Sequence, residues 1–210
     1  MKIRLNKSLT LLELLIALSL FSVIMLAVAS IQYFSRFHVV TSERQSLLQN
    51  EISFALEHMS KYVSQGAGPL ALERATGPAN GFRVRVDRNS TPTPADTNDD
   101  NWISYRLTGN PLRLTCSCAT ISASSPSCAN FIGGDLASHI RPGVSYNQIP
   151  SPLPANPSGF YINITNPGPS GGSMIELALV ARWQPANPVS LDNPQVVMKT
   201  SLYARGSATH

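Results

Sequence analysis

A single carboxylate, Glu13, lies near the front of the apolar stretch "NKSLTLLELLIALSLFSVIMLAVAS" at residues 6–30. A charged side chain in lipid costs free energy unless it is paired, so acids within membrane segments usually serve a function. The chemistry available to such a carboxylate is ion pairing with a cation in apolar surroundings. We therefore treat Glu13 as the first candidate functional residue.

Three cysteines, Cys116, Cys118 and Cys128, are close in sequence and could form one disulfide in an oxidising compartment. Neither a fourth cysteine nor a suitably spaced histidine accompanies them, which argues against a zinc site. Cys116 and Cys118 point to the same side of a strand, so they are poorly placed to bond each other. Cys128 is expected to pair with Cys118, which closes the smaller loop, or with Cys116.

The loop "DTNDDN" places Asp96, Asn98 and Asp100 at the first three ligand spacings of a calcium loop. Asn101 stands where such a loop needs glycine, and Leu107 stands where it needs a bidentate glutamate, so an EF-hand is excluded. Clustered oxygens attract hard cations, which leaves calcium as an alternative to the default interpretation, a solvated polar loop. We expect no other cofactor.

Catalytic patterns are missing from the sequence. It has no G-x-S-x-G nucleophile elbow, and "GPSGGS" lacks the lysine of a phosphate-binding loop. The histidines are scattered along the chain, at His38, His58, His139 and His210. The sequence therefore predicts no catalytic residues and a protein that is not an enzyme.

The apolar segment could form a membrane-spanning helix. At about 1.5 Å per residue, the uncharged run from Leu14 to Ile31 spans about 27 Å, close to the hydrocarbon thickness of a bilayer. Lys2, Arg4 and Lys7 precede it, and the positive-inside rule then puts the N-terminus in the cytoplasm and the rest outside. These residues supply most of the formal net charge of +4, so we expect no nucleic-acid partner.

Two ordinary explanations compete with a special role for this segment. An export signal could be cleaved after Ala29, at the small-x-small triplet Ala27-Val28-Ala29. The segment could also be a plain anchor with Glu13 at the cytoplasmic interface. The apolar run from Leu9 to Ile31 is longer than the apolar core of a usual export signal. Neither explanation accounts for a carboxylate at Glu13.

The stretch from Lys7-Ser8 through Leu9-Thr10-Leu11-Leu12-Glu13 resembles the class III signal of type IV pilins and type II secretion pseudopilins. That signal has a short basic leader, a small residue, and then a hydrophobic helix with glutamate at its fifth position. The resemblance covers about the first thirty residues. It implies that a prepilin peptidase cuts between Ser8 and Leu9 and methylates the new N-terminus. Most of the family has glycine before the cut and many members have phenylalanine after it, where this chain has Ser8 and Leu9.

The resemblance also implies a role for Glu13. Cleavage after Ser8 creates a cationic amine on Leu9, one helical turn from the carboxylate. In the family, this glutamate is thought to meet the N-terminal amine of a neighbouring subunit, which neutralises both charges and sets the register of assembly.

The apolar segment is predicted to continue as an amphipathic helix. Apolar residues recur every three or four positions, at Leu48, Ile52, Leu56, Met59 and Val63. Gly66 and Gly68-Pro69 end the pattern, which gives one helix of about 55 residues. The apolar segment lacks the helix-bending proline of many major pilins, which favours a minor pilin or a pseudopilin.

The remaining sequence predicts strands and polar loops. Strand-like patterns occur at 81–88, 102–116, 159–166, 173–183 and 195–206, and Thr108-Gly109-Asn110-Pro111 indicates a hairpin. We expect an antiparallel sheet laid across the second half of the helix, hence an α+β, pilin-like fold.

Together these features predict four parts: a basic leader (1–8), a transmembrane and assembly helix (9–35), its amphipathic continuation (36–66) and an extracytoplasmic β-rich domain (67–210). The expected function is a structural subunit of a type IV pilus or type II secretion-like filament. The expected partners are other pilin subunits, the prepilin peptidase, the inner-membrane assembly platform and the membrane. The alternative is a secreted or anchored β-rich ligand-binding domain whose signal is cut after Ala29.

Overall fold

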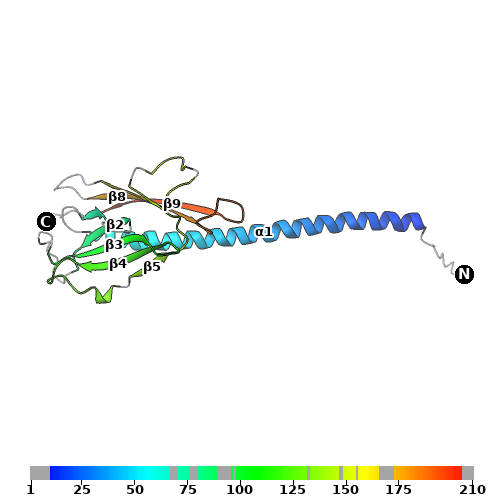
Figure 1. Ribbon diagram of the computed structural model, residues 1–210. Helices are drawn as coiled ribbons and strands as arrows, with labels where there is room; N and C mark the ends of the chain where they lie inside the picture. Colours follow the sequence, from blue (N-terminus) through cyan, green and yellow to red (C-terminus); the bar gives the residue numbers. More distant parts are fainter. Residues whose placement is uncertain are drawn as a thin grey trace. The chain divides into compact units, whose positions relative to one another are not determined.

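The computed structural model describes residues 10–66, 71–75, 80–88, 96, 98–131, 133–146, 149–154, 156–165 and 173–204. Within these ranges the chain forms one α-helix, nine strands and a short 3-10 helix, an α+β arrangement (Figure 1). The chain divides into two compact units, Met1–Glu43 and Arg44–His210. The boundary between the units falls inside the helix α1, which runs from Leu11 to Val63.

From Leu14 to Ile31, within the first unit, α1 carries no charged residue. Its most apolar 18-residue window has a mean hydropathy of 2.7, and none of that window is buried. Large side chains such as Leu11, Phe21 and Leu26 are more than half exposed. By length and composition α1 can cross a membrane, in agreement with the predicted transmembrane helix.

The part of α1 in the second unit is amphipathic, as its sequence period predicts. All five residues of the predicted stripe are buried, together with Ala55: the stripe is Leu48, Ile52, Leu56, Met59 and Val63. After Val63 the chain turns, and Gly66 forms a bridge with Val86. A Cβ at Gly66 would lie 2.9 Å from the Cβ of Ala204, so the close approach of the chain there favours glycine.

A five-stranded antiparallel sheet, in the order β1-β2-β3-β4-β5, forms one side of the second unit. Its strands are β1 (Leu72–Arg74), β2 (Gly81–Val86), β3 (Asn101–Thr108), β4 (Arg113–Thr120) and β5 (Gly134–Ala137). The predicted hairpin joins β3 to β4, and Gly109 there has φ +89°, a conformation that favours glycine.

A second sheet has four strands in the order β6-β7-β8-β9. They are β6 (Val144–Ser145), β7 (Phe160–Thr165), β8 (Met174–Arg182) and β9 (Gln195–Tyr203). The β6–β7 pair is parallel and the other pairs are antiparallel. The sequence placed all strands in one antiparallel sheet, whereas the structure divides them between two. Strands β1, β5 and β6 are too short for alternation to show in the sequence.

One hydrophobic core joins the stripe of α1 to both sheets, and Figure 1 shows strands of both sheets beside the end of the helix. Phe82 of β2 connects the layers, since its ring stacks on Tyr105 at 5.0 Å and meets Phe160 of β7 at 6.1 Å. A smaller cluster covers the opposite face of the four-stranded sheet, where Tyr161 and Val180 contact Leu153 and neighbouring apolar residues. Both faces of that sheet are therefore packed.

Truncation of the helix stripe tests this packing. Ile52 is fully buried, so Ile52→Ala should lower the free energy of unfolding of the full chain by about 2–5 kcal/mol through lost contacts and a residual cavity. Denaturant unfolding in detergent measures this change. Glu57→Ala, at an exposed position of the same helix, should change stability little. Equal effects of the two variants would contradict the assigned packing.

Candidate functional site

The first candidate, Glu13, lies in the first turn of α1. The Thr10 hydroxyl accepts a hydrogen bond from the Glu13 N–H at 3.3 Å, and the Glu13 carboxylate accepts from the Thr10 N–H and hydroxyl at 3.5 Å each. This reciprocal pattern is a capping box, which satisfies backbone N–H groups at the helix start. Ser8 and Leu9, the predicted cleavage residues, lie outside the described residues.

The 3.5 Å contacts leave the Glu13 carboxylate largely available. A strong charge-assisted hydrogen bond to a carboxylate is shorter, about 2.7–2.9 Å. The Glu13 side chain is exposed, and the structure places no cation beside it among the described residues of the first unit. The carboxylate can therefore accept a cationic partner without losing a stronger contact.

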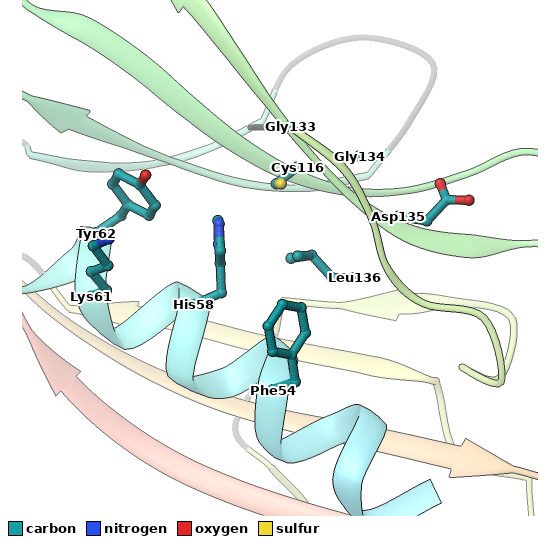
Figure 2. A pocket seen from close by; sticks show the side chains of 9 residues that line it. All are labelled: Phe54, His58, Lys61, Tyr62, Cys116, Gly133, Gly134, Asp135 and Leu136. Carbon is teal, nitrogen blue, oxygen red and sulfur yellow. The ribbon is translucent and has the colours of Figure 1, made fainter. Parts of the chain in front are cut away.

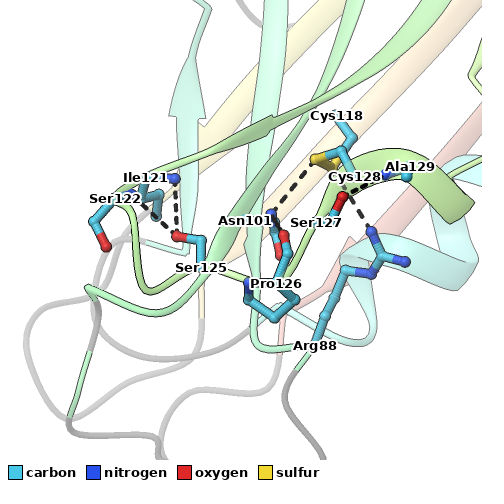
Figure 3. Close-up of a disulfide and its surroundings, with 10 residues drawn as sticks. All are labelled: Arg88, Asn101, Cys118, Ile121, Ser122, Ser125, Pro126, Ser127, Cys128 and Ala129. Carbon is cyan, nitrogen blue, oxygen red and sulfur yellow. Dashed lines mark hydrogen bonds between the residues drawn. A yellow bond between two sulfur atoms is a disulfide. The ribbon is translucent and has the colours of Figure 1, made fainter.

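The structure links Cys118 to Cys128, with 5.8 Å between their Cα atoms (Figure 3). This bond ties the end of β4 to the 3-10 helix Cys128–Asn130, where the Ser127 hydroxyl accepts from the Ala129 N–H. The buried Asn101 amide holds the same corner, since it donates to the Pro126 carbonyl at 3.0 Å. The disulfide joins residues that are 10 positions apart in sequence and closes this corner of the second unit.

Cys116 keeps a free, buried thiol. It lines a cavity of about 450 Å³ between α1 and strands β4 and β5, toward which Phe54, His58 and Tyr62 point (Figure 2). Burial raises the pKa of the Cys116 thiol and lowers the pKa of His58. Nδ1 of His58 lies 3.1 Å from the Tyr105 hydroxyl oxygen, within hydrogen-bond distance. A protonated thiol is a poor nucleophile, so this cavity has no activated cysteine.

The three calcium candidates, Asp96, Asn98 and Asp100, each have partners within the chain. The Asp96 carboxylate accepts a hydrogen bond from the Asn98 N–H at 3.0 Å, while the Asn98 carbonyl accepts from the hydroxyls of Ser124 and Ser125. Asp100 is buried and forms an ion pair with Arg85 at 3.2 Å. The Arg85 guanidinium thus already gives Asp100 a cationic partner, and calcium at Asp96, Asn98 and Asp100 stays a prediction. Within the described ranges, no three His, Cys, Asp or Glu residues are grouped to hold a metal.

Burial raises the pKa of the Asp100 carboxyl to about 6, although Arg85 opposes the shift. The neighbouring carboxylates of Asp87, Asp99 and Asp96 add to the rise. Asp100 is therefore a buried carboxyl whose protonation state affects stability where the central strand β3 begins, near the disulfide.

A polar cluster that the sequence did not indicate joins α1 to the loop after β5. Glu51 accepts hydrogen bonds from the Ser138 hydroxyl at 2.9 Å and from His139 Nδ1 at 2.7 Å, and the His139 ring stacks on Trp183 at 5.0 Å. Burial alone would raise the pKa of Glu51, but these hydrogen bonds and the charge of His139 lower it. The three residue types resemble a hydrolytic triad, yet Ser138 and Glu51 both contact Nδ1 of His139. In a hydrolytic triad one ring nitrogen of the histidine contacts the serine and the other contacts the acid, and this cluster does not have that arrangement. Its contacts instead hold the helix against the loop that follows β5.

Residues 3–29 match the family model of the prokaryotic N-terminal methylation motif. The chain carries the prepilin signature of type IV pilins and pseudopilins. The match confirms the resemblance seen in the sequence, and the matched segment contains Glu13 and leads directly into the rest of α1. The prepilin signature belongs to structural subunits and implies assembly with other pilin subunits and processing by a prepilin peptidase. No curated protein and no solved structure matched the chain.

The Asp100 carboxyl gives a pH-dependent prediction. Its pKa of about 6 in the folded chain exceeds the ordinary value of 3.8, so the folded chain binds this proton more tightly than the unfolded chain. The contribution of Asp100 to stability should therefore grow as the pH falls from about 6 to about 4. Asp100→Asn should remove this component from the melting temperature measured between those pH values.

Asp135→Asn is the control for that experiment, because Asp135 is an exposed carboxylate of the same sheet. It should leave the Asp100 component in place. An Asp100→Asn chain whose melting temperature follows the same pH profile as the wild type would contradict the assignment.

Proposed function

We propose that this protein is a structural subunit, a minor pilin or a pseudopilin, of a type IV pilus or a type II secretion-like filament. The observation that carries the proposal is the prepilin signature at residues 3–29, which continues into a helix whose apolar side chains are exposed among the described residues of the first unit. In the proposed pathway a prepilin peptidase cuts between Ser8 and Leu9 and methylates the Leu9 amine.

The exposed apolar surface of α1 supports this proposal. Exposed side chains from Leu11 to Val40 would be in water if the helix were alone, which costs roughly 25 cal/mol for each Å² of apolar area. Lipid removes that cost before assembly, and the helices of neighbouring subunits remove it afterwards. The same surface thus serves as a membrane anchor in the free subunit and as packing surface in the filament.

Glu13 is the proposed assembly residue. Cleavage would leave a cationic amine on Leu9, and a carboxylate and an amine that leave water together must pair. The contacts of Glu13 with Thr10 stay within one chain and are long, at 3.5 Å. A neighbour's amine would give the carboxylate a closer, charged partner, and it would do so in a single register of the two helices.

The basic leader and the apolar helix support insertion in the cytoplasmic membrane with the second unit outside. The disulfide of the second unit fits an oxidising compartment. The inner-membrane assembly platform is the proposed partner for extraction from the membrane. The lack of proline in α1 favours a minor pilin or a pseudopilin over a major pilus subunit.

Replacement of Glu13 tests the proposal. In the native host, Glu13→Ala should be exported and membrane-inserted as well as the wild type, yet its amount in sheared filaments should fall at least about tenfold, because about 1.4 kcal/mol of lost pairing changes an equilibrium that much. Quantitative immunoblots of the membrane and filament fractions measure both amounts.

Two control variants separate pairing from other effects. Thr10→Val removes the capping hydroxyl but keeps the carboxylate, and Ser19→Ala removes a hydroxyl that bonds within the helix, to the Ile16 carbonyl. Both should enter filaments. Normal assembly of Glu13→Ala, or a loss in Thr10→Val equal to that in Glu13→Ala, would contradict the pairing role.

A further inference from the structure

The Cys118–Cys128 disulfide has a hydrogen-bond donor beside each of its sulfur atoms (Figure 3). Nη1 of Arg88 donates to the Sγ of Cys118 at 3.7 Å. The side-chain amide of Asn101 donates to the Sγ of Cys128 at 3.5 Å. A neutral sulfur accepts hydrogen bonds weakly, whereas a thiolate is charged and accepts them strongly. Both donors therefore stabilise the reduced, thiolate form of these cysteines more than the disulfide.

The donor beside Cys118 is a permanent cation. A guanidinium stays protonated at any physiological pH, and a cation next to a cysteine favours its thiolate over its thiol. In thiol–disulfide exchange, the sulfur that forms the more stable thiolate is the better leaving group. The position of Arg88 thus favours attack on Cys128 and departure of Cys118.

The sulfur that would be attacked is close to solvent. Cys128 is half-buried and lies between two exposed residues, Ser127 and Ala129. The Asn101 amide also donates to the Pro126 carbonyl at 3.0 Å, which holds this segment against the start of β3. Access to the attacked sulfur is a requirement for exchange, and this corner of the folded second unit meets it.

The third cysteine of the chain does not supply the attacking thiolate. Cys116 is only 4% exposed, and burial raises the pKa of its thiol. A protonated thiol is a poor nucleophile. The reactive thiolate must therefore come from outside the chain.

We propose that the Cys118–Cys128 disulfide is a site of thiol–disulfide exchange with the dithiol of a reducing partner protein. One thiolate of the dithiol attacks the Sγ of Cys128, bonds to it and expels Cys118 as a thiolate beside Arg88. The second thiolate of the dithiol then attacks the first sulfur, closes the partner's disulfide and expels Cys128 as a thiolate. Two electrons pass to the cysteines of this chain, which take up the two protons that the dithiol lost. The site goes beyond the proposed function.

Reduction unties one corner of the second unit. The covalent link between the end of β4 and the 3-10 helix is lost, while other contacts of the corner do not depend on it. The Ser125 hydroxyl still accepts from the N–H groups of Ile121 and Ser122, at 3.1 Å and 3.0 Å. These contacts keep the two cysteines close, so the disulfide can form again.

The test uses the purified full chain in detergent at neutral pH, with dithiothreitol as the dithiol. Alkylation after an acid quench and intact mass count the thiols, which rise from one, Cys116, to three on reduction. The folded wild type should be reduced at a rate proportional to dithiothreitol and unchanged by denaturant below the unfolding transition. A disulfide that is reduced only when the chain unfolds would overturn the proposal.

Variants of Arg88 test the leaving group. Arg88→Met should slow reduction at least about threefold, and Arg88→Lys should restore most of the rate because it keeps the charge. Arg113→Met, at an arginine of the same strand that pairs with Asp135, should keep the wild-type rate. A loosened corner would speed reduction, so a slower rate does not come from misfolding. Equal rates for Arg88→Met and the wild type would overturn the proposal.

The wild type alone reports which sulfur is attacked. The monothiol glutathione forms only the first bond, and iodoacetamide then caps the thiol that leaves. Fragment-ion mass spectrometry should find glutathione on Cys128 and the cap on Cys118, and the reverse arrangement would overturn the proposal. None of these measurements involves assembly, so their results are independent of the outcome for Glu13→Ala.

Discussion

The helix α1 has to satisfy two different surroundings within one continuous element, and the remaining structure follows from this constraint. Between Leu11 and Val40 nearly all of its large apolar side chains are exposed, so the segment needs lipid or other helices around it. From Leu48 to Val63 a single stripe is buried, and both sheets complete its core. The second unit thus has its own core, and in the proposed assembly the first segment exchanges lipid for the helices of neighbouring subunits.

The proposed exchange gives the Glu13 carboxylate its role. In water the Thr10–Glu13 capping box would be an ordinary way to begin a helix. In an apolar setting the same carboxylate is a charge that must find a cation, and its long contacts with Thr10 do not supply one. The capping contacts and the proposed pairing do not compete, because the first satisfies N–H groups of the backbone and the second neutralises a charge.

The sequence predicted features that depend on local periodicity or on a local motif. The stripe from Leu48 to Val63 and the hairpin at Gly109 were confirmed, and the prepilin signature is confirmed by the match at residues 3–29. The division into two sheets was missed, because the pairing of β7 with β6 and β8 is set by tertiary contacts. The Glu51–His139 contact was missed for the same reason, since its two residues are distant in sequence.

The proposed function requires that the apolar helix is kept and that the chain is processed in front of it. The measurement that tests this requirement is the intact mass and N-terminal sequence of the mature protein, recovered from its native host. We expect a chain that begins at Leu9 and carries one extra methyl group on its N-terminus. A mature chain that begins at Ser30 would contradict it, because cleavage there removes Glu13 and much of the apolar helix and leaves an exported β-rich domain.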